Sequence, residues 1–174
     1  MKNSIRVRVA APVPAESARP HGRSEVKVSD RMSGKVLTVN ANDHIRRVWD
    51  LVEGNRLRRF PVMDGERLVG IITDRDLRNA TASSVVLTEK KYHDFLLDTI
   101  KVESVMTANP RTVSPDTDLL DAARIILDLK VGGLPVVEGD RLVGIITETD
   151  LVEALIEILP RSFRGEARQE HDHR

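Results

Sequence analysis

The chain has 174 residues, and its 27 basic side chains (Lys plus Arg) are balanced by 27 acidic ones. Without net charge there is no general attraction to nucleic acid or to an anionic membrane, and we expect neither as a partner. Cysteine is absent, which excludes disulfides, thiolate metal sites and a cysteine nucleophile. No apolar run approaches the roughly 20 residues that cross a bilayer, and no secretory signal is present, so we expect a cytoplasmic protein.

Both ends of the chain are polar. Residues 1–24 contain four arginines and three prolines but few large apolar side chains, too few to offset the entropy of ordering them. We therefore expect flexible tails over residues 1–24 and 161–174. His171 and His173 lie in the second tail, where no fixed coordination geometry favours a metal site.

The central part of the chain is duplicated. The segment RLVGIITDRDL at Arg67 returns as RLVGIITETDL at Arg141, 74 residues later, and the same offset aligns Met32 with Met106 without a gap. A fixed period of this kind indicates two copies of one structural unit, and two copies suggest a pseudo-twofold pair. We expect the first copy over residues 25–84, a helical connector over 85–101 and the second copy over 102–160.

Each copy opens with a short strand and a helix. Residues 36–39 and 111–113 are β-branched segments bounded by polar residues, which favours strands. In the second copy, Ser114 is expected to cap the following helix, with Pro115 at its first position. Apolar residues at helical spacing predict one buried face on each helix: Ile45, Val48 and Val52 in the first copy, and Leu119, Ala122, Ile126 and Leu129 in the second.

A β-hairpin and a second helix complete each copy. The segments FPVM and LPVV are joined to RLVGIIT by glycine-containing turns of hairpin length, and the residues that follow open a helix. The unit is therefore β-α-β-β-α, and the fold class is α+β (α/β). In the connector, one side of a helix is expected to be formed by Leu87, Tyr92, Phe95, Leu96 and Ile100.

A doubled β-α-β-β-α unit that carries VM, TV, PVV and LVGIIT.TDL in this order resembles the CBS-domain family, whose paired repeats are called a Bateman module. The TDRDL segment, followed by a connector and SVMT, is similar to the CBS part of acetoin-utilisation-type proteins. The resemblance implies a regulatory module that binds an adenine nucleotide (AMP, ADP or ATP) or an S-adenosylmethionine-like compound and signals to a partner protein. It also implies a homodimer, for which we expect helix faces around Trp49 and Ile125 or Ile126.

The candidate ligand site lies where each hairpin meets its second helix. In the family, Thr or Ser and Asp at this junction hold ribose and phosphate, which implies these roles for Thr147, Thr149 and Asp150. The N-terminus of the adjacent helix also favours phosphate. The first copy keeps Thr73 and Asp76, but an arginine replaces the second threonine, so we expect an altered ribose pocket there.

Phosphate charge favours the first copy. Arg58 and Arg59 occupy the position that reaches phosphate in nucleotide-binding relatives, whereas the second copy has glycines there. We therefore expect two unequal clefts and one nucleotide per chain. Since only 3% of the residues are aromatic, the adenine is expected among mostly aliphatic residues: Val36, Thr38, Phe60 and Pro61, or Thr112, Leu134 and Pro135.

Simpler interpretations remain open for these residues. Thr and Asp at the junctions are also preferred helix caps, and arginines near a strand edge also discourage strand pairing. No nucleophile elbow, Walker loop, Rossmann fingerprint or zinc-protease helix is present, so we expect neither an enzyme nor a catalytic cofactor. Two other functions are considered: a ligand-free interaction and dimerisation module, and nucleic-acid binding through the arginines of residues 1–24.

Overall fold

The computed structural model describes residues 26–55, 57–82 and 90–158. Both predicted tails and Leu87 lie outside this part of the chain. Repeat 1 (residues 26–82) contains η1 (Val28–Asp30), β1 (Val39–Asn40), α1 (Ile45–Asn55), β2 (Arg59–Asp64), β3 (Arg67–Thr73) and α2 (Asp74–Ala82). The connector helix α3 (Lys90–Thr99) follows. Repeat 2 (residues 100–158) contains α4 (Val102–Val105), β4 (Thr107–Ala108), α5 (Leu119–Leu129), β5 (Gly133–Glu138), β6 (Arg141–Thr147) and α6 (Glu148–Ile158).

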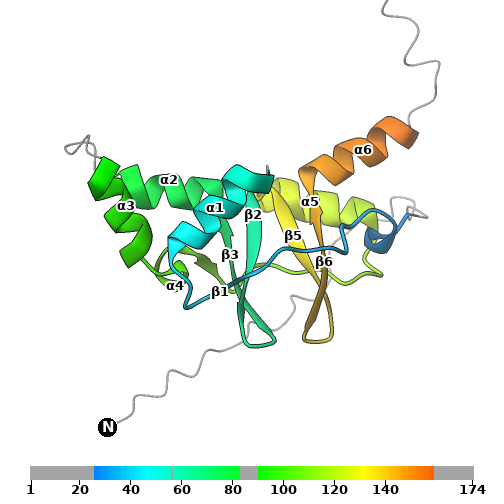
Figure 1. The fold of residues 1–174 in the computed structure, drawn as a ribbon. Coiled ribbons are helices and arrows are strands. Elements are labelled where there is room, and N and C mark those ends of the chain that lie inside the picture. Colours follow the sequence, from blue (N-terminus) through cyan, green and yellow to red (C-terminus); the bar gives the residue numbers. More distant parts are fainter. Residues whose placement is uncertain (1–25, 56, 83–89, 159–174) are drawn as a thin grey trace, which may run out of the picture.

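Two antiparallel hairpins, β2–β3 and β5–β6, lie side by side in the centre, with helices along one side (Figure 1). Their registers are the same: Val62 pairs with Gly70 in one, and Val136 pairs with Gly144 in the other. Each turn contains a glycine with a positive φ of about 60°, a conformation that favours glycine over residues with a side chain. The predicted tandem α+β unit is confirmed.

Each repeat lends its opening segment to the other repeat. The first lead segment (residues 26–38) crosses repeat 2, where Ser33 pairs with Ile145 of β6. The second lead segment (residues 100–112) crosses repeat 1, where β4 pairs antiparallel with β3. In Figure 1 the first lead segment starts beside repeat 2 and runs across to β1. The exchange interlocks the repeats and brings residues of both to each cleft between them.

Two glycines leave room for these crossings. A Cβ added to Gly70 would lie 2.4 Å from Sδ of Met106, and a Cβ added to Gly144 would lie 2.6 Å from Sδ of Met32. A methionine of each lead segment therefore packs directly over a glycine in the central strand of the other repeat. The aligned Met32 and Met106 and the repeated LVGIIT segments thus form one contact made twice.

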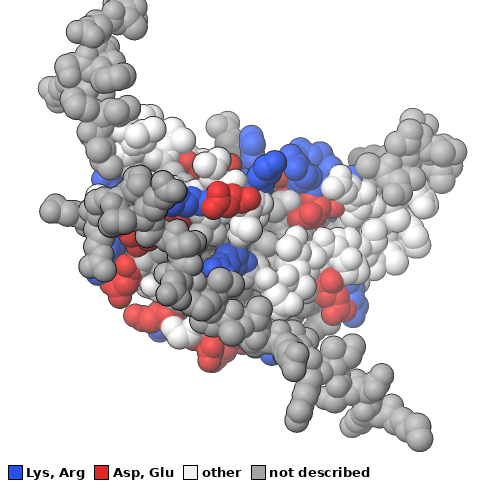
Figure 2. Space-filling model, turned by 180° about the vertical axis from the view of Figure 1, so that it is seen from behind, with Lys and Arg blue, Asp and Glu red and all other residues white. Residues whose placement is uncertain are grey.

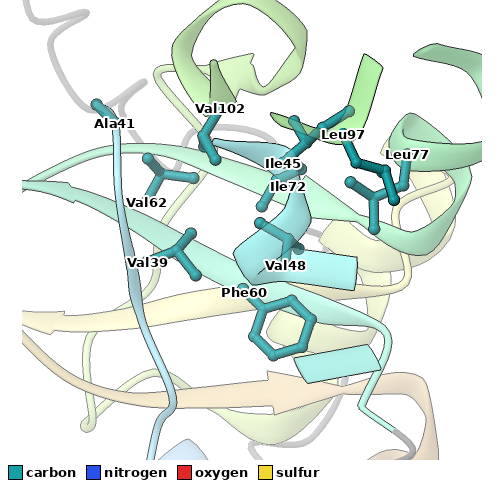
Figure 3. Close-up of a cluster of buried hydrophobic side chains, with 10 residues drawn as sticks. All are labelled: Val39, Ala41, Ile45, Val48, Phe60, Val62, Ile72, Leu77, Leu97 and Val102. Carbon is teal, nitrogen blue, oxygen red and sulfur yellow. The ribbon is translucent and has the colours of Figure 1, made fainter. Parts of the chain in front are cut away.

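The two hydrophobic cores contain residues from beyond their own repeat. The first core (Figure 3) includes Leu97 from α3 and Val102 from the second lead segment. The second core includes Val28 from the first lead segment. Burial of large apolar side chains is the main favourable contribution to folding, so the exchange of lead segments is part of what stabilises each repeat.

The connector helix is confirmed, but its predicted buried face is wrong in part. Leu97 is buried, whereas Phe95 is 60% exposed and Tyr92 also lies at the surface. The reason is the way in which α3 docks on α1. Arg46 forms ion pairs with Asp94 and Asp98, which therefore lie on the side of α3 that meets α1, while Leu97 is in the first core.

The expected start of the second-repeat helix is also wrong. Helix α5 begins at Leu119, and Asp118 caps it by accepting a hydrogen bond of 2.8 Å from the Leu120 N–H. Ser114 and Pro115 lie in a turn before the helix, because the first lead segment uses this stretch as a partner. The Ser29 N–H donates to the Pro115 carbonyl at 3.0 Å. At the other end of α5, Leu129 is exposed rather than buried.

Candidate functional site

The predicted threonine and aspartate residues cap the second helix of each repeat. In repeat 2, the Thr147 N–H and hydroxyl both donate to Oδ2 of Asp150, at 2.7 Å each. In repeat 1, Thr73 makes the same two bonds to Oδ2 of Asp76, at 2.8 and 2.7 Å. The capping interpretation is therefore confirmed, and Oδ1 of each aspartate forms no hydrogen bond within the described residues. A carboxylate oxygen of this kind accepts hydrogen bonds from hydroxyl groups.

Arg59 extends from repeat 1 to the second helix of repeat 2. It begins β2, and its Nη2 lies 3.7 Å from Oε2 of Glu148, the first residue of α6. Gly132 makes room for it, since a Cβ there would lie 1.4 Å from the same Nη2. The structure therefore places the cation of repeat 1 beside the Thr147–Asp150 cap of repeat 2. The sequence had suggested that phosphate charge favours repeat 1 and ribose chemistry favours repeat 2.

Arg58 has a different position from Arg59. It is exposed, and its backbone carbonyl accepts from the Asp74 N–H at 3.1 Å. The pseudo-equivalent bond joins the Glu148 N–H to the Gly132 carbonyl, also at 3.1 Å. Arg58 and Gly132, which precede β2 and β5, thus each anchor the start of the second helix in their own repeat. Of the two arginines, Arg59 is the one that reaches the other repeat.

The residues that were predicted to surround the adenine do not lie together. Val36 and Thr38 belong to the first lead segment, which crosses repeat 2, and Thr112 belongs to the second, which crosses repeat 1. Phe60 and Leu134 are core residues, and their side chains are fully buried. Pro61 and Pro135 are also buried. Thr149 and Arg75, which replace one another in the two repeats, are exposed on the first turns of α6 and α2.

A cavity of about 520 Å³ lies between the repeats on the side of the first lead segment. Its size is typical of small-molecule sites. Of the predicted residues it contains Val36 and Thr38. The remaining lining residues come from the first lead segment, β1, α1, the β2–β3 turn and the start of β6: Gly34, Val39, Asn40, Asp43, Arg47, Met63, Gly65, Glu66, Arg141, Leu142 and Val143.

Residues that sequence reasoning missed are those whose role depends on how one repeat packs against the other. Glu148 faces Arg59 although the two are far apart in the chain, and Gly132 matters only because Arg59 passes over it. The one available signal was the aligned substitution: arginines in repeat 1 stand where repeat 2 has glycines. An arginine in one repeat that aligns with a glycine in the other indicates that the arginine side chain can occupy the space beside the glycine.

An ion pair also joins the first lead segment to repeat 2. Lys27 Nζ lies 2.6 Å from Oδ1 of Asp116 and thereby fixes the first lead segment to repeat 2. This bond lowers the pKa of Asp116 and raises that of Lys27.

On the face seen in Figure 2, the group of basic side chains near the top has acidic ones beside it, so no extended basic stripe is formed there. Within the described residues, no helix is long and apolar enough to cross a bilayer.

Comparisons with known proteins agree with this geometry. The CBS domain model matches residues 28–83 and 102–157. A CBS domain-containing protein of Dictyostelium discoideum is 36% identical over 137 residues, which are 78% of this chain and 94% of the relative. The chain spans less than half the length of several other curated relatives.

Solved structures show the same arrangement. CBSX2 in complex with AMP is 29% identical, with a TM-score of 0.66 over 77% of this chain and 99% of CBSX2. The acetoin utilization protein (AcuB) from Vibrio cholerae is 31% identical, with a TM-score of 0.65 over 81% of this chain and 98% of AcuB. The chain is therefore a tandem pair of CBS domains and belongs to the CBS-domain family.

Proposed function

We propose that this chain is a non-catalytic regulatory module that binds an adenine nucleotide between its repeats, beside Arg59, Thr147 and Asp150. The observation that carries the proposal is the position of Arg59 at the N-terminal end of α6. It joins a guanidinium, which suits phosphate, to the hydroxyl and carboxylate groups that suit ribose. A related CBS protein has been solved with AMP, which supports an adenosine compound as the ligand.

Two parts of the nucleotide have candidate partners at the start of α6. Oδ1 of Asp150 accepts from the ribose hydroxyls, and the Thr149 hydroxyl is exposed on the first turn of α6. Arg59 and the positive end of the α6 dipole attract the phosphate. Val36 and Thr38 line the cavity beside the β2–β3 turn and the start of β6, so they are not assigned to the base at this site.

The pseudo-equivalent cleft in repeat 1 is the weaker site. It keeps the Thr73–Asp76 cap, but Gly133 stands in the position that corresponds to Arg59, so no cation comes across from repeat 2. Arg75 also replaces the threonine that corresponds to Thr149. One nucleotide per chain follows from this inequality.

A matched pair of variants tests the site. Asp150→Ala and Asp76→Ala remove the same cap bonds from α6 and α2, so both lose a similar cap contribution of about 1 kcal/mol. Only Asp150→Ala is expected to abolish the thermal stabilisation by AMP, which is about 2.7 kcal/mol at 100 times the Kd. Equal losses in the two variants would contradict the inequality. Flat melting curves with AMP, ADP, ATP and S-adenosylmethionine would favour the ligand-free interaction module.

We also propose that the module is a homodimer through α5 and α6. Of the expected contact residues, Ile126 is in the core, Ile125 and Trp49 are half-buried, and the Trp49 ring lies 4.9 Å from the ring of His93. The large apolar side chains that are exposed on α5 and α6 are Leu120, Leu127, Leu129, Val152, Leu155 and Ile156. We call these six residues the repeat 2 apolar face.

A second copy of the chain is the proposed partner for this face. In repeat 1, α3 packs on α1 and α2. The residues at the corresponding position after α6 are RGEARQEHDH, with only one alanine to bury. The 74-residue offset places His171 where repeat 1 has the buried Leu97, and we propose that a twofold contact between two such faces covers their apolar side chains.

Helix α6 connects the two proposed sites. It begins at the Thr147–Asp150 cap and carries Leu155 and Ile156 on its last turns. Glu157, on the same helix, forms an ion pair with Arg31 of the first lead segment. A ligand that shifts the start of α6 thus also shifts the dimer contact, and this is the route by which we propose that binding reaches a regulated protein. Such coupling requires that the ligand binds one packing of the repeats more tightly than another.

A further inference from the structure

The guanidinium of Arg59 has unused hydrogen-bonding capacity. Its only charged partner within the described residues is Glu148, and the 3.7 Å separation is an ion pair without a hydrogen bond. The Arg59 side chain is 27% exposed and that of Glu148 is 62% exposed. A guanidinium has five N–H donors in a fixed fork. Arg59 is thus held in place while its donors remain available to an incoming anion.

Glu148 is placed to compete with that anion. It is the first residue of α6, and its backbone N–H is fixed to the Gly132 carbonyl at 3.1 Å. Its carboxylate lies beside the Arg59 guanidinium at the start of α6. An anion that takes both sides of the Arg59 fork displaces Glu148, and an anion that does not displace it meets a like charge.

We infer that Glu148 is a specificity-determining residue, the resident counter-ion of Arg59, and that it lowers the preference of this cleft for phosphate-bearing over uncharged adenosine compounds. This rests on the proposed function, because Arg59 is the phosphate-binding group in both. Glu148 reduces the gain in binding affinity that each phosphate charge brings. The cleft then discriminates weakly between adenosine and AMP, and it favours AMP over the more highly charged ATP.

Repeat 1 offers a natural control. Asp74 is the pseudo-equivalent of Glu148, and its backbone N–H makes the same anchoring bond to Arg58. Its carboxylate is instead paired with Arg78 of its own helix at 2.9 Å. Gly133 stands where an arginine would reach across, and within the described residues no ion pair joins Asp74 to repeat 2. Neutralising Asp74 removes the same charge at the same place in the fold without releasing a phosphate-binding group.

The test is isothermal titration of the full chain with adenosine, AMP and ATP. Glu148→Gln is expected to tighten AMP binding about fivefold, the upper range for removal of an exposed ion pair, and to tighten ATP binding more. Adenosine affinity is expected to stay constant. Arg59→Gln is expected to weaken AMP binding about tenfold or more, since it removes a charge-assisted hydrogen bond. Asp74→Asn is expected to leave the AMP-to-adenosine ratio unchanged.

The double variant decides whether Glu148 acts through Arg59. In the Arg59→Gln background, Glu148→Gln is expected to give less than half of its original gain in AMP affinity, because the competition is gone. An undiminished gain, or an AMP-to-adenosine ratio that Glu148→Gln does not change, would overturn the counter-ion role while leaving the proposed function intact. Absence of adenosine and AMP binding by the unmodified chain would overturn both.

Discussion

The two repeats have the same backbone plan but different helix surfaces. In repeat 1, Arg46 of α1 pairs with Asp94 and Asp98 of α3, and Thr81 of α2 is buried. The positions 74 residues later carry Leu120 and Leu155, which are exposed. In repeat 1, helix α3 packs at this position, whereas in the described part of repeat 2 the corresponding side chains are exposed. The two copies of the duplicated unit thus differ most in what packs against their helices.

The starts of the second helices differ in a complementary way. Repeat 1 supplies Arg59, which reaches across to Glu148, and repeat 2 supplies the Thr147–Asp150 cap next to that glutamate. The proposed site therefore takes its polar groups from both repeats.

The largest expected effect comes from weakening the contact between α3 and the first core. Leu97→Ala removes a fully buried side chain from the first core and is expected to lower the free energy of unfolding by about 2–5 kcal/mol. Urea denaturation at an unchanged m-value measures it. The matched control is Phe95→Ala on the same helix, where the ring is exposed and the change is expected to stay within about 0.5 kcal/mol. The reverse order would mean that α3 docks by the face that its sequence suggested.

The exchange of lead segments has a smaller but symmetric test. Gly70→Val and Gly144→Val each push a side chain into the methionine that crosses the strand. Overpacking of this kind is expected to cost about 2 kcal/mol at each site, and the two costs should be similar because the contacts are the same. Gly54→Val is the control, since an added side chain there meets nothing. A neutral or stabilising result at Gly70 and Gly144 would be what strand propensity alone predicts.

Local pattern was sufficient for the elements that repeat 1 and repeat 2 share. Hairpin turns with glycine, the strand-to-helix junctions and the buried positions Ile45, Val48 and Ala122 follow from spacing and residue type. What failed depends on contacts between distant segments. Ser114 is a good cap by type, but the crossing lead segment uses Pro115 and Thr117 as acceptors and moves the helix start to Leu119.

The same limit applies to the candidate site. The residue types at Thr147 and Asp150 were identifiable, because caps and ribose partners need the same groups. The meeting of Arg59 with Glu148 was not, since periodicity within each repeat carries no information about which residues of the two repeats face one another. Packing of one repeat on the other gives a residue new neighbours without changing its local sequence.

A substitution in the repeat 2 apolar face is expected to have the next largest effect, on dimer affinity. Leu127→Glu introduces the residue that repeat 1 has at the corresponding position, Glu53. It is expected to weaken the proposed homodimer by about 1.5 kcal/mol, a Kd roughly tenfold higher, because a leucine is no longer buried at the contact. Sedimentation equilibrium measures this. Leu57→Glu, which changes an exposed leucine outside α5 and α6, should leave association unchanged, and a monomeric unmodified chain would exclude the dimer.

The smallest effect concerns the ion pairs that hold α3 on α1. The hydrogen bond from Arg46 lowers the pKa of Asp98 below its ordinary value of 3.8. The folded state therefore favours the ionised carboxylate, so this contribution to stability is complete above that value and is lost as the pH falls through the lower pKa of the folded state. Arg46→Leu introduces the residue of repeat 2 and should make the urea midpoint less dependent on pH between 6 and 3. The Lys27–Asp116 pair is retained in both proteins and has the same acid dependence, so only the difference between the two curves reports on Asp98. Identical curves would mean that α3 is held by Leu97 and its apolar neighbours alone, and the charge difference between the repeats would then have no part in why one is covered and the other is not.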